Sequence, residues 1–189
     1  MSDRRPEAVA RESLRGSAAA VSASEALAPL VVRVAQLIAS AFAKGHRLYV
    51  CGNGGSAADA QHFVAELIGR FTQEREPYPA IALSVNTSVL TAVANDYEFA
   101  EVFARQVRAH VREGDVLVGI STSGRSANVL RAFAAAPKGA IRVALFGSTS
   151  DADVADVVLR APGRSTAEIQ AAHAALIHAI CTVIDTPGI

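Results

Sequence analysis

Short apolar segments alternate with helical stretches over most of this chain, and this alternation restricts the fold more than any other feature. The apolar segments contain four to six residues and lie at 47–51, 80–83, 115–120, 141–146 and about 155–159. Continuously apolar strands are typical of a parallel sheet that is covered by helices on both faces. With right-handed crossovers, the sequence predicts an α/β fold built on a doubly wound, parallel, five-stranded sheet.

Helical periodicity fills the intervals between these strands. The predicted helices cover 56–70, 88–94, 98–112, 126–136 and 165–185.

A helical segment also precedes the first strand. Apolar residues recur at helical spacing from Ser24 to Lys44, and Gly45 ends the pattern. Residues 1–16 are charged and end at Gly16, which predicts a helix of modest stability or a frayed arm. We therefore expect an N-terminal helical segment, residues 1–44, ahead of one domain, residues 45–189.

Composition excludes several classes of protein. The 18 Lys and Arg residues balance 18 Asp and Glu residues, so the chain lacks the basic surface of a dedicated nucleic-acid binder. The mean hydropathy is +0.27, but no uninterrupted apolar run reaches the length of a membrane span. This excess of apolar residues predicts an oligomer. Cys51 and Cys181 lie in apolar surroundings, which indicates reduced core thiols in a cytoplasmic protein.

A glycine-rich turn joins the first predicted strand to its helix. The sequence Gly52-Asn53-Gly54-Gly55-Ser56 follows the strand directly. Glycines let the backbone curl so that several N–H groups point at one anion, and the N-terminus of the following helix adds positive potential. The turn therefore predicts a phosphate site. His62 and Glu66 follow at i and i+4, on one face of the helix, as a functional pair or as an ordinary solvated pair.

A serine-rich loop follows the third predicted strand. It reads Ser121-Thr122-Ser123-Gly124-Arg125-Ser126, and its hydroxyl and N–H groups can surround phosphate oxygens. The alternative is a simple N-cap with turn chemistry. Neither a Walker loop nor a dinucleotide-binding glycine motif is present, which disfavours nucleotide cofactors.

Two further groups of polar side chains have candidate roles. Gln170, His173 and His178 lie on the last helix, with Gln170 and His178 about 12 Å apart along its axis. These residues could address one ion from the two ends of a cleft, or in a site between subunits. Asn95 and Asp96 follow a short helix and predict either a left-handed C-cap or contacts to substrate hydroxyls.

Together these motifs resemble the phosphoheptose isomerases of the sugar isomerase (SIS) domain family. The similarity covers about residues 25–185 and is carried by 51–62, 91–97, 114–117, 120–130 and the Ile169-Gln-x-x-His173 motif. It implies a flavodoxin-like sandwich and a homotetramer with active sites at subunit boundaries, in which residues 1–44 belong to the oligomer core. It also implies conversion of D-sedoheptulose 7-phosphate to D-glycero-D-manno-heptose 7-phosphate through an enediol. This reaction begins bacterial heptose synthesis.

The resemblance also implies roles for individual residues. Glu66 and His178 are implied as catalytic residues, and zinc, one ion per subunit, as bound by His62, Glu66, Gln170 and His178. The implied substrate-binding residues are Asn53, Gly54, Gly55, Ser56, Glu66, Asn95, Asp96, Ser121, Thr122, Ser123, Ser126 and Gln170. Since one carboxylate cannot easily serve as both ligand and base, the roles of Glu66 remain alternatives.

A non-enzymatic relative offers a different function. An adaptor that binds the replication initiator DnaA shares the fold and many of the motifs, but it lacks the acid and the histidine at the positions of Glu66 and His178. This chain has both residues, which favours an enzyme. Arg125 and Glu168 depart from the family pattern, and we expect them to influence the choice of sugar or metal affinity.

Overall fold

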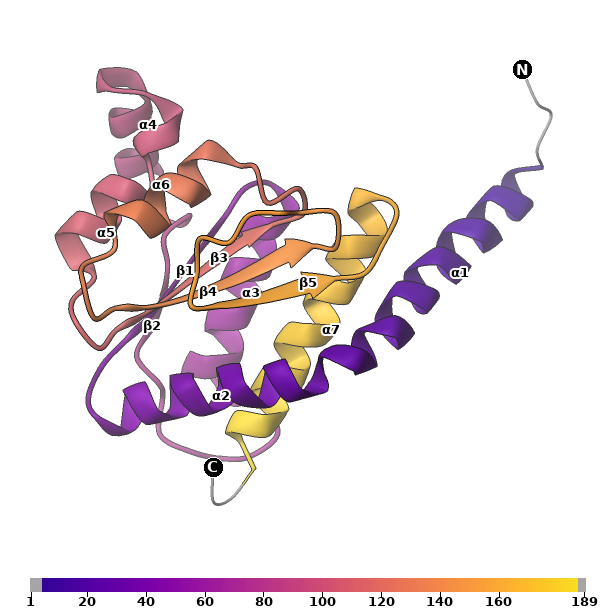
Figure 1. The fold of residues 1–189 in the computed structure, drawn as a ribbon, viewed down its shortest axis with the longest axis horizontal. Coiled ribbons are helices and arrows are strands. Elements are labelled where there is room, and N and C mark those ends of the chain that lie inside the picture. The colour runs from indigo at the N-terminus through magenta and orange to yellow at the C-terminus, as the bar shows by residue number, and fades with distance from the viewer. Residues whose placement is uncertain (1–4, 187–189) are drawn as a thin grey trace.

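The computed structural model describes residues 5–186 and contains a five-stranded sheet with helices on both faces (Figure 1). The strands are Leu48–Gly52 (β1), Ala80–Ala82 (β2), Val116–Ser121 (β3), Ile141–Gly147 (β4) and Val157–Ala161 (β5). All neighbours are parallel, in the order β2-β1-β3-β4-β5. This is the order of flavodoxin-like doubly wound sheets, so the predicted fold is confirmed.

The helices divide between the two faces of the sheet. They are Pro6–Ala23 (α1), Ala28–Ala43 (α2), Gly55–Ile68 (α3), Thr87–Asp96 (α4), Ala104–His110 (α5), Ala127–Ala135 (α6) and Thr166–Ile184 (α7), with short 3₁₀ turns at Ser24–Leu27 (η1) and Phe99–Glu101 (η2). Helices α2, α3 and α7 pack on one face and α5 and α6 on the other. The predicted helix over 98–112 is thus a 3₁₀ turn followed by α5.

Alternate side chains of each strand enter opposite cores. In β1, Leu48 and Val50 face α2, α3 and α7, whereas Tyr49 and Cys51 face α5 and α6. Every residue of β1 and β3 is buried, as continuous apolar strands require. Cys51 and Cys181 are buried, so their predicted place in the core is confirmed, and burial raises the pKa of each thiol to about 12.

The first helix is longer than the sequence predicted. The expectation that it ends at Gly16 is wrong, because α1 continues to Ala23. Gly16 is buried where α1 packs on α7, and an added Cβ there would lie 2.5 Å from Glu168 Oε1. The glycine therefore permits close approach of two helices. From this crossing α1 projects beyond the sheet (Figure 1).

Two helical stretches among the described residues are long and apolar enough to cross a membrane by length and composition. They are Pro6–Ala43 and Thr166–Ile184. The second is a core helix here, since eight of its residues are buried against the rest of the molecule. The first is largely exposed, which leaves its apolar surface available for contact with another molecule.

Candidate active site

The site begins where the strand order reverses, between β1 and β3. Gly52 at the end of β1 pairs with Ile120 near the end of β3, so the glycine-rich turn and the serine-rich loop leave the sheet side by side. In doubly wound sheets, ligands bind at this topological switch point, beyond the carboxyl ends of the strands.

The glycine-rich turn presents free backbone donors. Gly54 has a φ of +54°, a left-handed conformation that glycine adopts without strain. Its carbonyl accepts the N–H groups of Ala57 and Ala58 and starts α3. Among the described residues, the N–H groups of Gly54 and Gly55 have no acceptor, and both residues are exposed. These donors at the N-terminus of α3 are suited to an anion.

The serine-rich loop curls around its own hydroxyl groups. Ser121 Oγ and Ser126 Oγ are 2.9 Å apart, and the N–H groups of Gly124 and Arg125 donate to Ser121 Oγ and Ser123 Oγ at 3.1 and 3.2 Å. The loop ends at the N-terminus of α6, which adds positive potential. Hydroxyls and a helix N-terminus beside the glycine-rich turn form a cradle for a phosphate group.

A reciprocal amide pair joins the two halves of this cradle. The Asn53 and Asn128 side chains each donate an N–H to the oxygen of the other, both at 2.8 Å. Asn128 is buried on α6, and sequence reasoning did not assign it a role. The pair occupies the side-chain amide of Asn53, so the backbone of the turn is the part that remains open to a ligand.

Three further side chains converge on the outer surface of α3 and α7. Glu66 Oε1 lies 2.9 Å from His62 Nε2, and His178 Nε2 lies 3.3 Å from the same nitrogen. The side chains of His62 and Glu66 are 42% and 24% exposed, so the group is open to a small molecule. The tertiary structure thus brings together three residues that the sequence singled out on two separate helices.

These three residues fit a zinc ion. Their ligand atoms all lie within 4.8 Å of one another. Zinc bonds of about 2.0–2.2 Å place the ligands of a tetrahedron about 3.4 Å apart, close to the spacings seen. Two imidazole nitrogens and a carboxylate are also a donor set that zinc commonly accepts.

Gln170 lies nearer the cradle, two turns before His178. Its amide packs on Gly55 so closely that an added Cβ there would lie 2.0 Å from Gln170 Nε2. His173, on the next turn, is completely buried, and neither ring nitrogen has a hydrogen-bond partner among the described residues. His173 is therefore part of the core.

Asn95 and Asp96 form the last turn of α4. The alternative of a left-handed Asn cap is wrong, because no non-glycine residue in the described chain has a positive φ. Asn95 Nδ2 donates to Asp96 Oδ1 at 2.9 Å, and both side chains are exposed. Helix α4 stands apart from α3 and α7 (Figure 1), so these two residues do not join the His–Glu–His group within one chain.

Arg125 and Glu168, which depart from the family pattern, have different surroundings. Glu168 accepts the N–H of Arg164 at 2.7 Å, and its own N–H donates to the capping Ser165 Oγ at 3.3 Å. Since it also packs on Gly16, Glu168 supports the start of α7 and the crossing with α1. Arg125 is exposed at the rim of the cradle.

Open backbone donors and hydroxyl groups at the switch point of a flavodoxin-like sheet are typical of a domain that binds phosphorylated small molecules. The family model described as the SIS domain matches residues 15–148, which is most of the chain. Phosphoheptose isomerases from Thiobacillus denitrificans and Geobacter sp. strain M21 are 46% and 49% identical to this chain. The alignment with the Thiobacillus protein covers 88% of this chain and 87% of the relative. The alignment with the Geobacter protein covers 84% of each.

A solved structure agrees with these relatives. The phosphoheptose isomerase of Neisseria gonorrhoeae superposes with a TM-score of 0.86 at 44% identity, covering 95% of this chain and 97% of that one. The chain therefore belongs to the phosphoheptose isomerase family of SIS-domain proteins. It is an enzyme, a sugar-phosphate isomerase.

Proposed function

We propose that this enzyme interconverts D-sedoheptulose 7-phosphate and D-glycero-D-manno-heptose 7-phosphate, the first step of bacterial heptose synthesis, in the cytoplasm. The names of its relatives support a phosphorylated heptose as substrate. The observation that carries the proposal is the placement of the phosphate cradle and the His62–Glu66–His178 group at two ends of one surface.

The spacing of these two ends suits a long sugar phosphate. Gly55 and His62 are seven residues apart on α3, which is about 10 Å along the axis. The eight bonds from C1 of a heptose 7-phosphate to phosphorus span about 9–10 Å at roughly 1.2 Å per bond. A phosphate in the cradle therefore places C1 and C2 near the three side chains, whereas a triose phosphate is too short.

The side chains at that end supply the groups that isomerisation needs. Glu66 removes a proton from C1 of the ketose, which leaves a cis-enediol, and returns the proton to C2 to form the aldose. His178 carries the hydroxyl proton between O1 and O2. The cradle donors of Gly54, Gly55, Ser121, Thr122, Ser123 and Ser126, with the Ser56 hydroxyl beside them, hold the phosphate and orient the chain.

The same side chains are proposed to hold zinc, one ion per subunit. His62, Glu66 and His178 would provide three ligands, and Gln170 is proposed as the fourth. Zinc held by these residues would supply Lewis-acid chemistry, which favours negative charge on the substrate oxygens. The roles of Glu66 as zinc ligand and as base are alternatives, because both use the same carboxylate oxygens.

We further propose that the active enzyme is a homotetramer with each site at a subunit boundary, and with residues 1–44 in the oligomer core. None of the residues of α4 is buried, although its last turn carries Asn95 and Asp96. A second subunit beside the cradle would bring such a pair to the substrate hydroxyls. The adaptor alternative gains no support, because Glu66 and His178 both join the three-residue group.

Replacement of the candidate base tests this function. We expect Glu66→Gln to lower kcat for sedoheptulose 7-phosphate by about 10²-fold or more, because the amide cannot accept the C1 proton. The measurement is aldoheptose phosphate formation by zinc-supplemented protein. Glu74→Gln is the matched control, since the Glu74 side chain is 85% exposed and forms a surface ion pair with Arg70 at 3.7 Å.

Two results would contradict the proposal. Full activity of Glu66→Gln would remove the carboxylate from the mechanism. A wild-type tetramer that is inactive with sedoheptulose 7-phosphate but active with a shorter ketose phosphate would overturn the substrate.

A further inference from the structure

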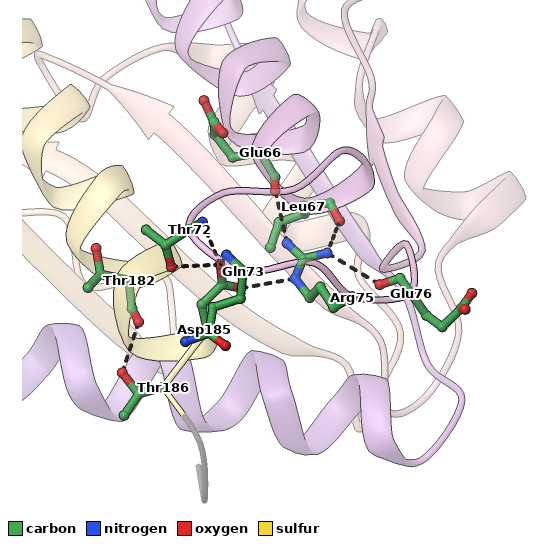
Figure 2. A network of polar contacts seen from close by, with 9 residues as sticks. All are labelled: Glu66, Leu67, Thr72, Gln73, Arg75, Glu76, Thr182, Asp185 and Thr186. Carbon is green, nitrogen blue, oxygen red and sulfur yellow. Dashed lines mark hydrogen bonds and ion pairs between the residues drawn. The ribbon is translucent and has the colours of Figure 1, made fainter.

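The segment between α3 and β2, residues 69–79, passes over the C-terminal ends of both helices that carry the three-residue group. Figure 2 shows the polar contacts that hold this segment in place. They centre on two residues, Arg75 in the segment and Asp185 at the end of α7. Sequence reasoning gave neither of them a role.

The carboxylate of Asp185 accepts several hydrogen bonds from the segment 69–79. Oδ2 accepts from the N–H and hydroxyl of Thr72 at 2.8 and 3.1 Å and from the N–H of Gln73 at 3.3 Å. Oδ1 accepts from Arg75 Nε at 2.9 Å, and the side chain is 2% exposed. Burial alone would raise the pKa of Asp185, but the hydrogen bonds from Arg75 and Thr72 hold the pKa below its usual range.

Arg75 connects Asp185 to the end of α3. Its Nη2 donates to the Glu66 carbonyl at 2.9 Å and its Nη1 to the Leu67 carbonyl at 2.8 Å. These carbonyls belong to the last turn of α3, where intrahelical donors are missing and positive charge is favourable. The guanidinium also lies 4.3 Å from the centroid of the Tyr78 ring. Its planar fork therefore links α3 to α7 in a fixed geometry.

This link touches the candidate site on both helices. Arg75 binds the backbone of Glu66 itself, whose carboxylate points away from the bonded carbonyl (Figure 2). Asp185 follows His178 by seven residues, two turns along α7. The tethered segment also carries Phe71, whose ring stacks on the His178 imidazole with centroids 5.6 Å apart.

The three-residue group thus lies between two contacts that join α3 to α7, one near the start and one near the end of the helices. At the start of the helices Gln170 packs on Gly55, and at the end Arg75 joins α3 to Asp185. We propose that Arg75 and Asp185 are positioning residues that fix the register of His178 against His62 and Glu66 and hold Phe71 on His178. This inference rests on the proposed role of that group.

A purely structural role of Arg75 and Asp185 predicts a different result. A buried ion pair adds little net stability over apolar packing, and its better attested use is to specify one arrangement. If Arg75 and Asp185 only stabilise the fold, their loss lowers the melting temperature and leaves the group intact. If they set its geometry, metal affinity and the surroundings of His178 change as well.

The experiment compares Asp185→Asn with Asp156→Asn. Asp156 pairs with Arg142 at 2.9 Å and accepts the Arg142 N–H at 2.8 Å, at the starts of β4 and β5, away from the switch point. Zinc affinity is measured by competition with a chromophoric chelator. The imidazole resonances of zinc-free protein are followed by NMR, with His178 assigned from His178→Gln. Arg75→Lys, which keeps the charge and loses the fork, is the milder variant if Asp185→Asn does not fold.

We expect Asp185→Asn to weaken zinc binding about tenfold, as with other outer-shell changes, and to shift the His178 resonance. We also expect a lower kcat with KM for the sugar phosphate changed less than twofold, since the cradle lies at the other end. Asp156→Asn should leave zinc affinity and the His178 resonance unchanged. A lower melting temperature of Asp185→Asn with wild-type zinc affinity and resonance would overturn the inference.

Failure of the proposed function is distinguishable from failure of this inference. Wild-type protein that neither binds zinc nor converts the heptulose phosphate would contradict the function. The NMR comparison of zinc-free proteins would still decide the positioning role. A shift of the His178 resonance in Asp185→Asn but not in Asp156→Asn supports the positioning role. An unchanged His178 resonance in Asp185→Asn refutes the positioning role.

Discussion

At the scale of single residues, His173 is a histidine in the apolar core. Its ring is completely buried without a hydrogen-bond partner among the described residues, and burial lowers its pKa to about 4. The imidazole is therefore neutral in the folded protein across the physiological range. Five residues further along α7, His178 is exposed, so one helix carries a core histidine and a site histidine.

The lowered pKa of His173 predicts that the stability of the protein depends on pH. Between about pH 6.5 and 4 the unfolded chain binds a proton at His173 that the folded protein does not, so stability falls as pH falls through this window. Across this window, the loss in the free energy of unfolding that is due to His173 reaches about 3 kcal/mol. Denaturant unfolding between pH 4 and 7 should show a weaker dependence in His173→Gln. His110→Gln, at an exposed position, is the control; equal slopes in the two variants would contradict the assignment.

At the scale of elements, the cradle depends on contacts between a turn and a helix that are 75 residues apart. The Asn53–Asn128 pair sets the glycine-rich turn against the start of α6. We expect Asn128→Ala to cost about 1–3 kcal/mol of stability, because it leaves the Asn53 amide unpaired. It should also raise KM for the sugar phosphate and weaken inhibition by inorganic phosphate several-fold, with kcat little changed.

The neighbouring Gly119→Ala variant separates the two effects. A Cβ at Gly119 of β3 would lie 2.6 Å from Phe133 on α6, which overpacks the core between β3 and the same helix that carries Asn128. Such overpacking costs about 1–3 kcal/mol without removing a hydrogen bond of the cradle. Steady-state kinetics and phosphate inhibition of the two variants provide the measurement. Equal changes in KM would show that Asn128 acts through stability alone.

At the scale of the whole molecule, apolar surface gathers on the N-terminal helices. A groove of about 480 Å³ between η1, α2 and α7 is lined by Val31, Val32, Leu176 and Ala179, among others. Val32 is 38% exposed, and Leu14 on the projecting α1 is 71% exposed. Contiguous apolar surface of this kind is typical of a subunit interface.

A charge in this groove therefore tests the proposed assembly. We expect Val32→Glu to shift the tetramer towards smaller species, because a carboxylate would have to be desolvated at the contact. Sedimentation velocity measures the shift, and Ser40→Glu, at an exposed polar position of α2, is the control. An unchanged tetramer in Val32→Glu would place the interface elsewhere. Loss of activity along with the tetramer would support a site shared between subunits.

The sequence alone determined the sheet, the order of its elements and the local motifs. Continuous apolar strands, helical spacing and glycine-rich turns are local patterns, so five strands and the switch-point loops followed from them. The expectation that Gly16 ends a helix is wrong because a helix-ending glycine and a glycine at a helix crossing look the same in sequence. The difference depends on Glu168, which lies 152 residues away.

Only the tertiary structure decided which side chains meet. It joined His178 to His62 and Glu66, placed Gln170 on Gly55, buried His173 and separated α4 from the rest of the site. It also revealed Asn128, Arg75 and Asp185, whose partners lie 75 and 110 residues away. The physical reason is that such contacts depend on how the helices pack across the sheet, and packing is set by the whole core rather than by any local pattern.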